Sequence, residues 1–119
     1  MPVFSSIDML QGYLKVLTDR QQMIASNMAN IDTPGYHTKD LNFHAAIRQV
    51  MDAEGSGSGP LLEQASFETN GLPERPDGNN VNIDRESMLM AQTQLQFQMG
   101  VNLVKSDLSM VMTAIKEGS

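Results

Sequence analysis

Two apolar stripes, one near each end of the chain, constrain the fold more than any other feature of the sequence. The first advances in alternating steps of four and three residues, through Val3, Ile7, Leu10, Leu14, Leu17, Gln21, Ile24, Met28 and Ile31. Such steps give the period of about 3.5 residues that is typical of a coiled-coil helix. At about 1.5 Å per residue, the stripe is about 40 Å long. We therefore expect a long N-terminal helix with one apolar edge.

The second stripe repeats this alternation near the other end of the chain, through Met90, Gln94, Phe97, Val101, Val104, Leu108, Val111 and Ile115. Further apolar residues flank it, namely Leu89, Leu95, Met99, Leu103, Met110 and Met112. An apolar surface this broad is covered only when additional helices pack on it. We therefore expect a mainly α fold, in which two long terminal helices form an antiparallel, coiled-coil-like hairpin beside a small irregular middle lobe.

Each stripe contains one polar member, Gln21 in the first and Gln94 in the second. A polar residue inside an apolar seam can fix the register of two helices at some cost in stability. Alternatively, the long glutamine side chain lies along the edge of the seam with its amide in water. The sequence leaves both interpretations open.

Local signals mark where the two helices begin and end. Asp84 precedes an acidic turn, so we expect it to cap the second helix. Pro34 disfavours helical geometry in the residue before it, and Gly35 readily adopts a positive φ, so the first helix should stop near Ile31. The expected organisation is an N-terminal helix at 1–34, an irregular middle region at 35–83 and a C-terminal helix at 84–117.

The middle region is expected to form at most a small lobe. Residues 44–54 carry a weak helical period, and residues 61–69 can supply a short β strand with Ala65 and Phe67 on one face. Between these segments, the Gly/Ser-rich stretch 55–60 has the composition of a linker or a loop tip.

The composition excludes several classes of function. The net charge of −6 argues against binding to nucleic acid or to an anionic membrane surface. The absence of cysteine excludes a disulfide framework and a thiolate metal site. No apolar run approaches the roughly 20 residues of a membrane span. The first residues lack a basic segment followed by an apolar one, so we expect no cleaved secretion signal.

No constellation of residues favours catalysis or a cofactor. His37 and His44, the two histidines, are seven residues apart in a stretch that we expect to be irregular. A zinc site would need further ligands at suitable spacing, so we interpret both as surface or loop residues. The sequence also lacks the nucleophile elbow, the phosphate loop and the EF-hand spacing. We therefore expect no catalytic residue, no metal site and no cofactor.

Residues 27–36 form the most specific motif of the chain. They run Asn-Met-Ala-Asn-Ile-Asp-Thr-Pro-Gly-Tyr, which resembles the N-x-A-N-x-x-T-P-G-Y signature of the flagellar rod and hook protein family. The matching residues are Asn27, Ala29, Asn30, Thr33, Pro34, Gly35 and Tyr36.

A second segment, residues 75–86, is similar to the stretch that precedes the C-terminal helix in the proximal-rod branch of that family. Together with the short middle region, it favours the proximal-rod proteins over their longer relatives. FlgC is the nearest alternative, and the intact Thr-Pro-Gly-Tyr run argues against it. The resemblance covers about residues 5–48 and 74–117.

The first motif also has a physical interpretation that does not depend on the family. Asn27 and Asn30 lie beside the seam in the last turn of the helix, where they can bond helix-end carbonyls or a neighbour's backbone. The residues after them turn the chain out of the helix, and Tyr36 can pack back against the helix end. Alternatively, the motif is only a strong helix stop.

The resemblance implies a structural role and a set of partners. It implies export of the unfolded chain through the flagellar type III path, followed by packing of its terminal helices into a hollow helical tube. The implied location is the basal-body rod in the periplasmic space. The implied partners are other copies of the chain, FlgC, FliE, further rod subunits, the MS ring and the export gate. The expected assembly interface comprises Leu10, Leu14, Leu17, Ile24, Met28, Ile31, Phe97, Val101, Val104, Leu108, Val111 and Ile115.

Two other functions compete with this one. A soluble coiled-coil adaptor or export chaperone would use the same helices to bind a partner without polymerising. A small enzyme would need a convergent site that the sequence does not indicate. Because the stripes need neighbours to cover them, we also predict that the terminal segments of an isolated chain are largely disordered or weakly helical.

Overall fold

The computed structural model describes residues 3–52 and 66–118 of the chain. In order, the elements are helix α1 (Val3–Ala29), strand β1 (Lys39–Leu41), helix α2 (Phe43–Asp52), strand β2 (Ser66–Glu68) and helix α4 (Ile83–Glu117). The whole Gly/Ser-rich stretch 55–60 and Ala65 therefore lie outside the described residues, and the linker expectation stays a prediction.

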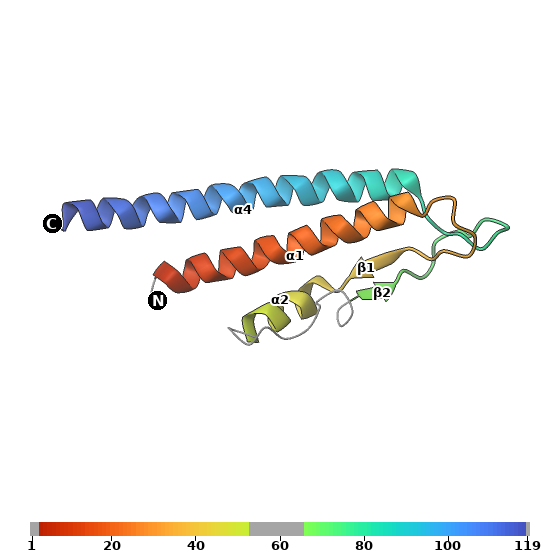
Figure 1. The fold of residues 1–119 in the computed structure, drawn as a ribbon, viewed down its shortest axis with the longest axis horizontal. Coiled ribbons are helices and arrows are strands. Elements are labelled where there is room, and N and C mark those ends of the chain that lie inside the picture. The colour runs from red at the N-terminus through yellow and green to blue at the C-terminus, as the bar shows by residue number, and fades with distance from the viewer. Residues whose placement is uncertain (1–2, 53–65, 119) are drawn as a thin grey trace.

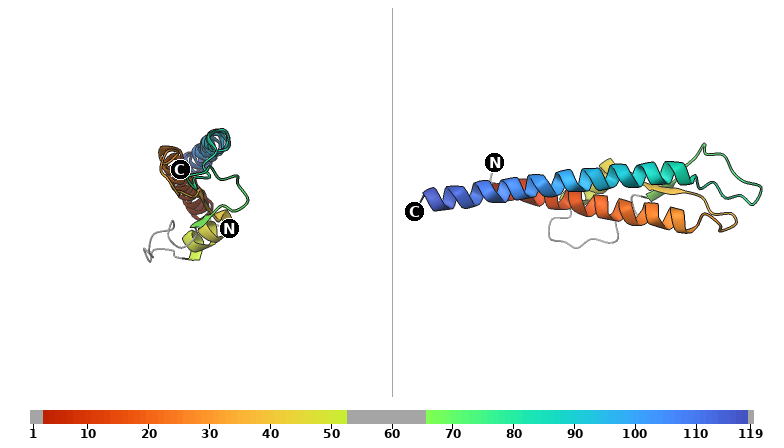
Figure 2. Two further views of the ribbon diagram at one scale, coloured as in Figure 1. Left: turned by 90° about the vertical axis from the view of Figure 1, so that its right-hand side faces the viewer. Right: turned by 90° about the horizontal axis from the view of Figure 1, so that it is seen from above.

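The two terminal helices form a long antiparallel hairpin (Figure 1). The molecule measures 68 × 28 × 19 Å. Helix α1 lies between α4 on one side and a small lobe, made of α2, β1 and β2, on the other (Figure 1). A view from above shows α4 running past the start of α1, so that one end of the hairpin is open (Figure 2). The mainly α hairpin with a small middle lobe is thus confirmed.

Helix α1 has apolar residues on two sides because it packs against the lobe on one side and against α4 on the other. Val16 and Met23, which lie seven residues apart and outside the predicted stripe, join Leu41 and Ala46 in a buried cluster with the lobe. The ring of Phe43 at the start of α2 packs edge-on against Tyr13 of α1, with the ring centroids 5.7 Å apart. Three stripe residues, Ile7, Leu17 and Ile24, are also buried, at 8%, 0% and 2% exposure.

Helix α4 meets α1 along a line of small and polar residues. The buried residues of α4 are Glu86, Thr93 and Gly100, which are spaced seven apart. A Cβ atom at Gly100 would lie only 2.7 Å from Cδ2 of Leu14, so the absence of a side chain there lets the helices approach closely. The predicted apolar stripe of α4 lies beside this line, and its members Phe97, Val101 and Val104 are half-buried. Gln94 is exposed, which favours the edge position over a register role for that residue.

The start of α4 differs from the expectation. Its N-cap is Asn82 and not Asp84: Asn82 has extended backbone angles, φ −112° and ψ 109°, and its side-chain oxygen accepts a hydrogen bond from the backbone N–H of Arg85 at 3.1 Å. Asp84 lies inside the first turn, where its charge still faces the positive end of the helix. The prediction of Asp84 as the cap is therefore wrong, because a cap needs non-helical backbone geometry and Asp84 is already helical.

The two short strands pair antiparallel, with Asp40 opposite Phe67. A further bond, from the backbone N–H of Thr69 to the carbonyl of Thr38 at 2.8 Å, extends the ladder toward the closed end of the hairpin. In the part of the chain that the structure describes, no helix is both long enough and apolar enough to cross a membrane.

Candidate functional site

The two sequence motifs meet at the closed end of the hairpin, around the amide side chain of Asn27. This side chain is 1% exposed. Its Nδ2 donates to the carbonyl of Lys39 at 2.8 Å and to Oε1 of Glu86 at 3.3 Å. Its Oδ1 accepts from the hydroxyl of Tyr36 at 2.9 Å and from the N–H of Lys39 at 3.1 Å. One side chain thus joins α1, the loop of the first motif, β1 and α4, and we call this group of contacts the Asn27 junction.

A network of charged side chains surrounds the Asn27 junction. Oε1 of Glu86 lies 3.0 Å from Nη1 of Arg85, and Nη2 of the same arginine lies 3.8 Å from Asp40. Asp40 also lies 3.4 Å from Nε of Arg20 on α1. The carboxylate of Asp40, on β1, therefore lies between Arg20 of α1 and Arg85 of α4.

Glu86 is fully buried, and its burial raises the pKa of its carboxyl above the ordinary value. The hydrogen bond from Asn27 and the charge of Arg85 act in the opposite direction but are smaller. Among the described residues, the second carboxyl oxygen, Oε2, has no hydrogen-bond partner. The junction therefore holds a carboxyl group whose ionised form is disfavoured by its surroundings.

The second motif caps the end of α1 from outside. Nδ2 of Asn79 donates to the carbonyls of Asn30 at 2.9 Å and Thr33 at 2.8 Å, and Oδ1 of Asn79 accepts from the N–H of Val81 at 2.8 Å. The guanidinium of Arg75 bonds the carbonyl of Ile31. These carbonyls follow the last turn of α1 and would otherwise need water or a partner.

Asn80 continues this contact toward the small sheet. Its Oδ1 accepts from the N–H of Thr38 at 2.6 Å, within the buried interior. The backbones of the two motifs also touch, because a Cβ on Gly78 would lie 3.3 Å from Cα of Gly35. Both glycines have positive φ, 86° and 75°, which other residues adopt only at a cost.

Sequence reasoning put Asn27 and Asn30 at the end of a helix, but it missed that the second motif supplies partners for that end. The signal was present in the pair Asn79-Asn80, whose buried amides carry the contacts. The first motif has two faces. Asn27 and Tyr36 bond inward, as described above, whereas the exposed members are Ala29, Asp32, Thr33, Pro34 and Gly35.

Many large apolar side chains of α4 are exposed. Its exposed large apolar residues are Ile83, Met88, Leu95, Met99, Leu103, Leu108, Met110, Met112 and Ile115, with exposures between 42% and 70%. α4 has 35 residues and α1 has 27. Because Gly100 lies opposite Leu14 in an antiparallel pair, the last turns of α4 run past Val3, where α1 begins.

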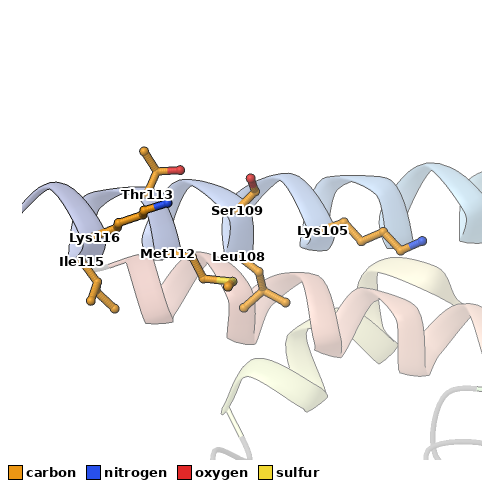
Figure 3. A pocket seen from close by; sticks show the side chains of 7 residues that line it. All are labelled: Lys105, Leu108, Ser109, Met112, Thr113, Ile115 and Lys116. Carbon is orange, nitrogen blue, oxygen red and sulfur yellow. The ribbon is translucent and has the colours of Figure 1, made fainter.

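An open groove of about 630 Å³ lies along the last turns of α4, near the start of α1. Leu108, Met112 and Ile115 point to one side of the helix and form its apolar floor, and Lys105 and Lys116 stand at its two ends (Figure 3). We call this feature the lysine-rimmed groove.

The structure divides the twelve residues expected at the assembly interface. Leu17 and Ile24 are buried within the chain, whereas Leu108 and Ile115 are 46% and 68% exposed. The other eight are half-buried, namely Leu10, Leu14, Met28, Ile31, Phe97, Val101, Val104 and Val111.

The histidines occupy loop and surface positions. Nδ1 of His37 lies 3.5 Å from Glu68 and its Nε2 lies 3.1 Å from Glu74, while His44 is exposed. Within residues 3–52 and 66–118, no group of three or more histidine, aspartate or glutamate side chains is close enough to hold a metal ion.

Comparison with known proteins links this geometry to one family. The model of a family described as "Flagella basal body rod protein" matches residues 14–37, which include the first motif. The flagellar basal body rod protein FlgB of Salmonella typhimurium (strain LT2) is 31% identical over 126 residues, covering 92% of this chain and 91% of that protein. FlgB of Escherichia coli (strain K12) is 28% identical, with 92% and 91% covered, and FlgB of Borrelia hermsii is 29% identical, with 93% and 96% covered.

These alignments cover 92% and 93% of this chain, so the likeness is not limited to one segment. The chain therefore belongs to the family of the flagellar basal body rod protein FlgB, a structural component of the flagellum and not an enzyme.

Proposed function

We propose that this chain is exported unfolded through the flagellar type III path and folds into the proximal rod, where its terminal helices pack with those of neighbouring subunits into a hollow helical drive shaft. The proposed neighbours are other copies of the chain, FlgC, FliE and further rod subunits, with the MS ring and the export gate at the base. The proposed location is the periplasmic part of the basal body.

The observation that carries this proposal is the apolar surface of α4. Met110, Met112 and Ile115 are each at least 67% exposed in the last turns of α4. Burying one such side chain contributes about 1.5–3 kcal/mol. Three of them on one short segment therefore favour association strongly enough to offset the entropy of ordering that segment.

The twelve predicted interface residues fit this proposal in two groups. Residues such as Leu17 and Ile24 would hold the hairpin together, so that it presents a fixed surface. Residues such as Leu108 and Ile115 would contact neighbouring subunits directly. The terminal segments 1–34 and 84–117 would then form the assembling part, and the middle region 35–83 would lie beside it.

An adaptor or export chaperone remains the alternative, because it would also expose apolar helix surface. It would form a closed complex of defined size, whereas a rod subunit needs contacts that repeat. The apolar residues of α4 lie on more than one face of the helix, which favours contacts with more than one neighbour.

The test is the replacement Leu108→Asp, with Ser106→Asp as its matched control. Leu108 lies on the floor of the lysine-rimmed groove (Figure 3), whereas Ser106 is exposed and does not line it. The first variant puts an unpaired charge into the proposed contact, so we expect normal expression but no rod incorporation and no swimming. The control should swim. Full motility of the Leu108→Asp strain would refute packing through this face.

A further inference from the structure

The loop between β2 and the second motif contains the one asparagine of the chain that precedes a glycine, in the pair Asn70-Gly71. We propose that Asn70 is a site of spontaneous deamidation, which converts this asparagine to aspartate and isoaspartate in the folded chain. This modification is independent of the proposed rod function, because it needs only the local structure of the loop.

The reaction requires no enzyme and no reactant other than water. The backbone nitrogen of Gly71 loses its proton and attacks the side-chain amide carbon, Cγ, of Asn70, and the side-chain nitrogen leaves as ammonia. The product is a five-membered succinimide ring. Water then opens this ring in one of two ways: breaking the new bond from Cγ to nitrogen gives aspartate, and breaking the original peptide bond gives isoaspartate.

Both reacting groups are accessible in the structure. Asn70 and Gly71 are exposed, and within the described chain neither the side chain of Asn70 nor the backbone N–H of Gly71 makes a hydrogen bond. Gly71 has a positive φ of 85°, and a Cβ atom added to it would meet no atom within 4 Å. With no side chain and open space beside it, this glycine leaves its nitrogen unhindered.

The other seven asparagines are less suited to this reaction. Each precedes a residue with a side chain, which hinders closure of the ring. Asn102 is exposed but lies inside α4, where the helix engages the backbone N–H groups. The remaining six make side-chain hydrogen bonds, namely Asn27, Asn30, Asn42, Asn79, Asn80 and Asn82.

The pair Asp77-Gly78 shows how the fold protects a related sequence. An aspartate before glycine can form the same ring with loss of water. Here, however, the N–H of Gly78 donates to the carbonyl of Arg75 at 2.8 Å, and Oδ1 of Asp77 accepts from the N–H of Asn79 at 3.0 Å. Both reacting groups are engaged, so the structure assigns the reactivity to residue 70 and not to residue 77.

The modification alters the segment that joins the small sheet to the second motif. It adds one negative charge to a chain whose net charge is already −6. The isoaspartate product also lengthens the main chain directly after Thr69, whose N–H donates to Thr38 at 2.8 Å and whose carbonyl accepts from Asn80 at 3.4 Å. A long-lived subunit would therefore accumulate a chemical change beside these contacts.

Incubation of the folded full chain, followed by peptide mapping, tests this inference. Cleavage after Glu68 and Glu74 releases residues 69–74, in which Asn70 is the only asparagine. We expect this peptide to gain, with time, the mass difference between an amide and a carboxylic acid, and to separate into two products, one of which isoaspartyl methyltransferase methylates. The rate should rise severalfold per pH unit above neutral, because the attacking nitrogen must lose its proton. Peptides with the other asparagines should change at least tenfold more slowly.

The matched control is Asn70→Gln, which keeps an exposed amide but would need a less favourable six-membered ring, so it should stay unmodified. The chain unfolded in urea is the second control: Asp77 should isomerise there but not in the folded chain. An Asn70 that stays intact in the folded chain would overturn the inference. Isomerisation of Asp77 that is as fast in the folded chain as in urea would also overturn it, because the fold would then not select the reactive pair.

Discussion

At the scale of single residues, Asn27 is the side chain on which the closed end depends most. It makes two donor and two acceptor contacts while almost fully buried. An amide has two donor hydrogens and one acceptor oxygen with two lone pairs, so this arrangement uses its full capacity. Aspartate lacks the two donor hydrogens, and glutamine would place the amide one bond farther from the backbone. These contacts therefore explain in physical terms why the first residue of the motif is asparagine.

Replacing Asn27 with alanine should therefore destabilise the hairpin. The N–H and carbonyl of Lys39 and the hydroxyl of Tyr36 would lose their partners, at about 1–3 kcal/mol for each buried group left unpaired. We expect a loss of about 3 kcal/mol in the free energy of unfolding, measured by urea denaturation with circular dichroism. Asn30→Ala is the control, because its side-chain bonds to Ser26 and Thr33 are exposed, and it should cost less than about 1 kcal/mol. Equal losses in the two variants would contradict the role given to Asn27.

Glu86 gives the same site a dependence on pH. Because burial raises its pKa, the folded chain binds this proton more tightly than the unfolded chain does. The resulting penalty on stability is fully present above the folded pKa and disappears as the pH falls through it toward the ordinary value of 4.5. Asp77 acts in the opposite sense: its lowered pKa adds stability at pH values above its ordinary 3.8, and this stability is lost as the pH falls below that value.

The prediction for Glu86 is a comparison of two pH profiles. Glu86→Gln keeps an oxygen that can accept from Asn27 and removes the charge. The free energy of unfolding of the unchanged chain, measured relative to this variant, should rise as the pH is lowered from neutral toward 4.5. Parallel profiles would mean that Glu86 is ionised at no cost in the folded state.

At the scale of elements, the sequence predicted the two helices well because helical periodicity is a local property. The stripes of α1 and α4 were visible in the spacing of apolar residues, and the exit from α1 was marked by Pro34 and Gly35. The contact between the helices was not predictable in the same way. It runs along Thr93 and Gly100, where smallness matters more than hydrophobicity, and no apolar pattern points to such a line.

Gly100 provides the test of that contact. Gly100→Val adds bulk where even a Cβ atom would lie 2.7 Å from Leu14, so the helices must separate or Leu14 must move. We expect a loss of about 1–3 kcal/mol in the free energy of unfolding, as is typical of overpacking. Because the blocking atom is the end of a flexible side chain, adding Leu14→Ala should recover part of the loss. Strictly additive losses would show that the two residues do not meet.

At the scale of the whole molecule, burial is concentrated at the closed end and falls toward the open end. The last buried residue of α4 is Gly100, and the large apolar residues beyond it are exposed or half-buried. The joining of the two motifs could not be predicted from sequence, because contacts such as that between Asn27 and Glu86 link residues 59 positions apart. Periodicity carries no information about such pairings, and only the resemblance of both motifs to one family indicated that they belong together.

This gradient predicts how an isolated chain behaves. In hydrogen exchange of the monomer, amides near Glu86 and Thr93 should be protected, whereas amides after about Gly100 should exchange fast. That outcome would mean that only the residues at the open end of the hairpin, and not the whole terminal segments, are disordered in the isolated chain. On assembly, the same amides should become protected. Uniform protection of α4 in a dilute monomer would contradict folding coupled to assembly.

The position of the Asn27 junction in the sequence also determines when the chain can complete its folding. Its partners come from residues 27, 39 and 86, so the junction closes only after nearly the whole span between the first and second motifs is available. A chain that emerges from a narrow channel, starting from either terminus, would have most of its residues outside the channel before the Asn27 junction could form. On the proposed export route, the Asn27 junction would therefore form only after passage.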